Sequence, residues 1–115
     1  MTPTALRKFA LSLPGAVELP HFDRASFRVG TKIFATLTRD GDEAMVRVHD
    51  ANRVDVLLEE QPDVFFSYGG WTTRGGALGV RLGNVEVTLM KELVRDAWSQ
   101  IATKKRPPAV RKRSK

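Results

Sequence analysis

The sequence predicts a two-layer α+β domain. Three helices would cover one face of a five-stranded antiparallel sheet, in the order α-β-β-β-α-β-β-α. Alternating apolar and polar residues between positions 24 and 49, helical periodicity in three other segments, and proline or glycine between segments support this prediction. We expect residues 1–103 to form a single domain, since this length suffices for one hydrophobic core, and residues 104–115 to be a basic disordered tail.

The central segment is predicted to be a meander of three strands, Arg24–Val29, Lys32–Arg39 and Glu43–His49. Because side chains alternate across a strand, one face would be apolar and would pack against the helices. That face would carry Ala25, Phe27, Val29, Ile33, Ala35, Leu37, Ala44, Val46 and Val48. The opposite, solvent-facing side would carry Arg24, Ser26, Arg28, Lys32, Phe34, Thr36, Thr38, Glu43, Met45, Arg47 and His49.

The remaining elements follow from capping and periodicity. Helices are expected at Pro3–Leu13, Ala51–Gln61 and Leu89–Ala102, with Thr2, Asp50 and Thr88 as their respective N-caps. Ala16–Asp23 is expected to be an irregular connection. Two further strands, Val64–Tyr68 and Ala77–Leu82, would flank the glycine-rich loop GGWTTRGG.

Composition excludes several classes of function. The chain has no cysteine, which excludes disulfides, thiolate catalysis and cysteine-ligated metals. No apolar run reaches the roughly 18 residues that would span a bilayer, and the N-terminus lacks a signal-peptide pattern, so we expect a cytoplasmic protein without a membrane partner. The net charge of +6 comes from positions 104–115, which hold seven basic residues and no acid.

Candidate catalytic and metal-binding residues are few. His21, Asp23 and Ser26 lie close in sequence, but no nucleophile elbow surrounds Ser26, and triads are recognised by geometry. His21 and His49 are the only histidines, without the spacing of a metal site. The glycine-rich loop lacks a phosphate-binding pattern. We therefore expect a non-enzymatic protein without a metal or cofactor.

Basic side chains on the solvent-facing side of the meander suggest a different function. Long cations beside an aromatic ring suit phosphate contact together with base stacking. The sequence therefore predicts weak binding of DNA or RNA through this face and the tail. The candidate residues are Arg24, Arg28, Lys32, Phe34, Arg47, Arg81, Lys104, Lys105, Arg106, Arg111, Lys112 and Arg113.

An alternative accounts for the same face. An ordinary solvated sheet can carry such charges, and charged patches often have no ligand. Phe34 and Met45 would instead anchor a protein partner or a second copy of the chain. The protein would then be a protein-interaction or chaperone-like module.

Four stretches together resemble the MmcQ/YjbR-like family over about Leu6–Lys105. They are LPGAVELPHFDRASFRVGTKIFATL, DVLLEEQPDVFF, GVRL and ELVRDAWSQIATKK, in that order. The resemblance implies a YjbR-like (CyaY-like) α+β fold, in agreement with the element order above. Members of that family are commonly described as DNA-binding through a proposed double-wing arrangement, and the resemblance brings no catalytic residues.

Overall fold

The computed structural model describes residues 1–69 and 76–105, with side chains up to Ala102. Within these residues the chain forms three helices and one six-stranded sheet in which all neighbouring strands are antiparallel. The sheet order is β1-β2-β3-β4-β6-β5. The elements are α1 (Pro3–Ser12), β1 (Ala16–His21), β2 (Arg24–Val29), β3 (Lys32–Thr38), β4 (Glu43–Arg47), α2 (Ala51–Glu60), β5 (Phe65–Ser67), β6 (Ala77–Arg81) and α4 (Val87–Lys105).

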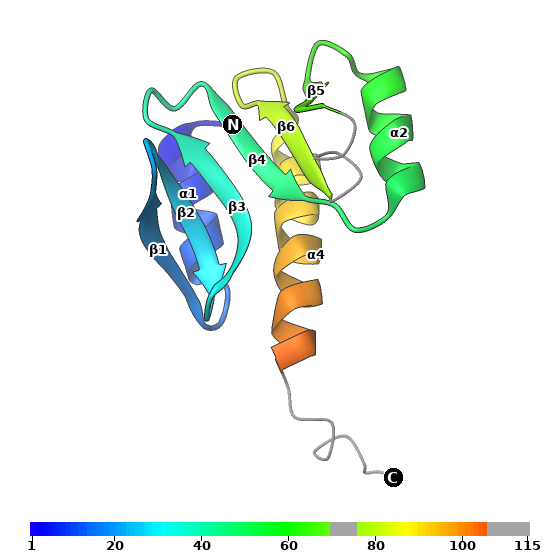
Figure 1. Cartoon of the computed structure of the whole chain (residues 1–115). Coiled ribbons are helices and arrows are strands. Elements are labelled where there is room, and N and C mark those ends of the chain that lie inside the picture. Colours follow the sequence, from blue (N-terminus) through cyan, green and yellow to red (C-terminus); the bar gives the residue numbers. More distant parts are fainter. Residues whose placement is uncertain (70–75, 106–115) are drawn as a thin grey trace, which may run out of the picture.

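The helices lie on one side of the sheet, as predicted. α1 and α4 pack behind β1–β4 and α2 lies beside β5, so the other face of the sheet is open in Figure 1. The core between the layers is made of side chains from both, including Phe27, Phe65, Met90, Leu93 and Val94. We call the sheet face that points away from α1 and α4 the open face.

β1 corrects the prediction of five strands. The segment Ala16–His21 belongs to the predicted irregular connection Ala16–Asp23 but is a strand. It pairs along its whole length with β2 and forms the edge of the sheet. Proline is tolerated on an edge strand because one side of that strand makes no ladder hydrogen bonds. Glu18 points to the helix side, where its carboxylate accepts a hydrogen bond from Nε of Arg7 (2.8 Å).

A bulge in β3 corrects the predicted position of Phe34. Phe27 pairs with Ala35, but the next residue, Arg28, pairs with Ile33, so Phe34 is an extra residue in β3. An extra residue reverses the alternation of side chains beyond it. Phe34 is consequently in the core with no exposed surface, rather than on the open face.

The first two helices begin directly after their predicted N-cap residues. The hydroxyl of Thr2 accepts a hydrogen bond from the Ala5 N–H, and the Asp50 carboxylate accepts one from the Asn52 N–H. α4 differs from the prediction, because it begins at Val87 and continues through Lys105. Thr88 is therefore inside its first turn, and Lys104 and Lys105 belong to the helix rather than to a tail.

Candidate nucleic-acid interface

One row of directly paired residues crosses the open face from β1 to β5. The pairs are Leu19 with Ser26, Ser26 with Thr36, Thr36 with Met45, Met45 with Gly79, and Gly79 with Phe66. Residues that pair directly share one face of a sheet. We call these six residues the central row; it contains no charged side chain and reaches all six strands.

Arginines lie on both sides of the central row. On one side, Arg28 is two positions from Ser26 along β2, and Arg47 is two positions from Met45 along β4. On the other side, Arg24 is two positions from Ser26, and Arg81 is two positions from Gly79 along β6. Glu43, which pairs with Arg81, is the acidic residue that the open face carries at its described strand positions. Four cations against one carboxylate give this face a positive potential, although the chain outside positions 104–115 is close to neutral.

Hydrogen bonds hold Arg24 and Arg28 over the small polar residues of the central row. Arg28 Nε donates to the Ser26 hydroxyl (2.8 Å), which itself donates to the Leu19 carbonyl (2.8 Å). Arg24 Nη1 lies 3.5 Å from the Thr36 hydroxyl. A guanidinium has five N–H donors, so these contacts orient both arginines and leave donors for a phosphate.

Phe66 lies at the β5 end of the central row. A Cβ at Gly79 would overlap the Phe66 ring, so glycine permits this ring to lie against β6. Arg81 Cζ is 5.0 Å from the ring centroid, in cation–π geometry, and Nη1 of Arg81 donates to the Pro62 carbonyl (3.2 Å). The Tyr68 ring meets Phe66 edge-on with centroids 5.3 Å apart. The open face therefore offers aromatic surface next to a cation.

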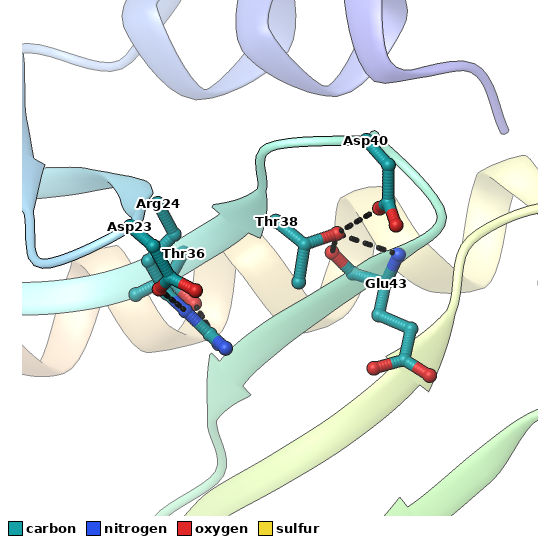
Figure 2. Close-up of polar contacts among 6 residues, drawn as sticks. All are labelled: Asp23, Arg24, Thr36, Thr38, Asp40 and Glu43. Carbon is teal, nitrogen blue, oxygen red and sulfur yellow. Dashed lines mark hydrogen bonds and ion pairs between the residues drawn. The ribbon is translucent and has the colours of Figure 1, made fainter.

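Figure 2 shows the side of the open face that lies near the turn between β3 and β4. Arg24 reaches toward Asp23 (Nε to Oδ1, 3.7 Å) and Thr36, while the Thr38 hydroxyl donates to the Asp40 carboxylate (2.8 Å). The backbone N–H of Asp42 also donates to Asp40 and, together with Thr38, holds the pKa of that carboxyl below its ordinary value. Asp40 therefore stays charged and fixes the turn.

The structure unites only part of the residue set that the sequence predicted. Arg24, Arg28, Arg47 and Arg81 share the open face. Lys32 pairs with Val29 and so points to the helix side, and Phe34 is buried; the bulge causes both differences. The backbone of Lys104 and Lys105 belongs to α4, but the structure does not describe their side chains. Arg106, Arg111, Lys112 and Arg113 fall outside the described residues.

Sequence reasoning missed Leu19 and Phe66 as members of the open face. Leu19 was missed because β1 was not predicted. Phe66 could have been found, because in the predicted strand Val64–Tyr68 it alternates with Phe65, which is buried. Alternation alone does not say which of the two rings faces the helices; pairing with Gly79 does.

The side chains of His21, Asp23 and Ser26 do not form a catalytic arrangement. Ser26 is completely buried, and its hydroxyl is bonded to Leu19 and Arg28. The His21 ring instead packs edge-on against Phe22 (centroids 4.7 Å apart). Residues 1–69 and 76–105 contain neither a group of three or more potential metal-ligating side chains nor a helix long and apolar enough to cross a membrane.

Comparison with known proteins identifies the domain. The family model described as YjbR matches residues 11–100. The crystal structure of Deinococcus radiodurans protein DR2400, with family-model domain DUF419, superposes with a TM-score of 0.77 at 23% sequence identity. The match covers 97% of this chain and 86% of that protein, and at this identity it supports the shared fold. No curated protein matches the sequence.

Proposed function

The chain belongs to the YjbR family, and we propose that it is a small non-enzymatic domain that binds nucleic acid weakly through the open face. The observation that carries the proposal is the placement of Arg24, Arg28, Arg47 and Arg81 on both sides of an uncharged row. Phosphate contacts provide most of the affinity in sequence-independent binding, and they need such long, permanently charged side chains. Basic residues at positions 104–115 would add affinity without sequence preference.

The hydrogen bonds of the arginines support the proposal. A flexible surface arginine loses side-chain entropy when it binds a phosphate, whereas Arg24, Arg28 and Arg81 are already held by Thr36, Ser26 and Pro62. Preorganisation of this kind reduces the cost of binding. Thr36, Ser26 and Pro62 are neutral, so these contacts do not cancel the positive charge. Of the three arginines, Arg24 also has a carboxylate nearby, that of the exposed Asp23 at 3.7 Å.

A pair of double variants tests the site. Arg28→Glu with Arg47→Glu reverses two charges on the open face, and Lys8→Glu with Lys91→Glu makes the same change on α1 and α4, on the helix side. Affinity for a random duplex is measured by anisotropy over a range of salt concentrations. The open-face variant should lower the slope of log K against log[salt] by about 1.8, for two lost phosphate contacts. Equal losses in both variants would show that only net charge matters.

A second experiment removes the basic residues that follow α4, positions 106–115. A chain that ends after Lys105 keeps all of α4. It should bind every sequence more weakly and with a smaller salt slope, but binding should remain measurable at low salt. If this chain does not bind at all, the open face is not a nucleic-acid site.

Exposed apolar residues near β1 support the alternative of a protein-interaction module. Val17 and Leu19 on the open face are 46% and 44% exposed, and Phe22 in the adjoining hairpin turn is 95% exposed. Of the two predicted anchors, Phe34 is buried and cannot serve, whereas Met45 is on the open face and partly exposed. Sedimentation of the wild type and of Val17→Ser with Phe22→Ser separates the two functions. Self-association that this variant abolishes, without nucleic-acid binding by the wild type, would favour the module.

A further inference from the structure

The geometry points to single-stranded nucleic acid as the ligand class, bound across the strands with its bases over the central row. This inference rests on the proposed function and adds the class and direction of the polymer. In a duplex the bases are stacked inside, and only phosphates and groove edges reach a flat sheet face. In a single strand the bases are free to stack on aromatic rings and on guanidinium planes, so a face that carries both suits a single strand better.

The shape of the central row supports this orientation. Ser26, Thr36 and Gly79 are buried: Arg28 and Arg24 bond to the first two, and the Phe66 ring lies against Gly79. A base above the row would therefore meet the two guanidinium groups and the ring. Leu19 and Phe66 close its two ends. Five strand spacings of about 4.8 Å give a length of roughly 24 Å. This length corresponds to a few nucleotides, near the lower limit of the about 4–16 that single-strand-binding folds cover.

Phe66 takes the stacking role that the sequence assigned to Phe34. Its ring belongs to the open face, is partly exposed, and is fixed by Gly79 on β6 and by the nearby Tyr68 ring. Arg81 lies beside it, so that one base and its phosphate would meet the ring and the guanidinium together. At the other end of the row, the exposed Leu19 would give apolar contact to a base, and Arg28 lies on the adjacent strand.

The first experiment compares single strand and duplex in the full chain. The probes are a labelled oligothymidylate of about 12 nucleotides and a random duplex of equal length. Phe66→Leu keeps an apolar side chain but removes the aromatic ring. It should weaken single-strand binding at least fivefold, the lower end of the effect of losing one stacked base, and change duplex binding less than twofold. Because residues 106–115 act on both probes, their contribution cancels in the ratio of single-strand affinity to duplex affinity.

A matched pair of variants tests the path of the strand. Leu19→Glu places a negative charge at the β1 end of the central row, whereas Leu11→Glu places it on α1 at a similar exposure (44% against 39%). Only the Leu19 variant should reduce oligothymidylate binding. Equal effects of the two variants would contradict a path along the row.

Three results would overturn the inference, and they separate it from the proposed function. If Phe66→Leu leaves single-strand binding intact, or weakens both probes equally, while Arg28→Glu with Arg47→Glu still weakens binding and lowers the salt slope, the open face binds phosphate but not stacked bases. If the full chain binds neither probe at low salt, both proposals fail. Photocrosslinking of iodouracil-containing oligonucleotide to the wild type covers the case in which Phe66→Leu does not fold. Adducts on Phe66, Met45 or Tyr68 would support the inference, and adducts confined to residues 106–115 would overturn it.

Discussion

Phe34→Ala should be one of the most destabilising substitutions on the sheet, although simple alternation places Phe34 in solvent. The side chain has no exposed surface and belongs to the same core cluster as Phe27 and Phe65. Removal of a buried phenyl group loses its transfer free energy and leaves a cavity, with a total cost of about 3–5 kcal/mol. Small domains have about 5–15 kcal/mol of stability in total, so the variant should be close to unfolding at room temperature.

Urea unfolding followed by far-UV circular dichroism measures this effect. Ile33→Ala is the matched control, because the neighbouring Ile33 shares the open face with Arg28 and is only partly buried. We expect Ile33→Ala to cost clearly less than Phe34→Ala. If the order is reversed, with Phe34→Ala within about 0.5 kcal/mol of the wild type as for an exposed site, β3 has no bulge at this position.

Three other predictions address local structure. Phe22→Gly should raise the free energy of unfolding by up to about 1 kcal/mol in thermal unfolding, because Phe22 is 95% exposed at a φ of 59°, where a side chain is strained. Trp98→Phe should cost about 1 kcal/mol, since the indole N–H donates to the Pro14 carbonyl (2.8 Å); an unchanged unfolding midpoint would contradict that hydrogen bond. By NMR titration, Asp40 should show a pKa below the ordinary value of aspartate. Its stabilising effect is then present above the ordinary pKa and lost as pH falls through the lowered one.

Most of the fold could be predicted because local patterns and tertiary packing agree there. The bounds of β2 match the prediction residue for residue, and α1, α2, β4 and β6 differ from it by one or two residues at one end. These segments combine a regular apolar face with a proline, glycine or capping residue at their ends. The charged part of the open face followed from the same alternation, which placed Arg24, Arg28, Arg47 and Arg81 correctly.

The errors arise where tertiary context decides. Pro20 reads as a strand breaker, and only the position of β1 at the sheet edge makes it acceptable. The β3 bulge has no sequence signature of its own, since Ile33, Phe34 and Ala35 are all apolar. Simple alternation buries either Ile33 and Ala35 or Phe34 alone, whereas the bulge buries both Phe34 and Ala35. The choice depends on which volume the helices leave to be filled.

The bulge links the stability of the domain to the composition of the open face. Without it, Phe34 would project between Arg28 and Arg47, and its phenyl ring would block one side of the central row. With it, the ring lies in the hydrophobic core, and the smaller Ile33 takes the position opposite Arg28. Among the described residues, the aromatic ring of the row is then Phe66 at its β5 end, next to Tyr68. The single extra residue in β3 therefore decides both what holds the sheet to its helices and where a base could stack.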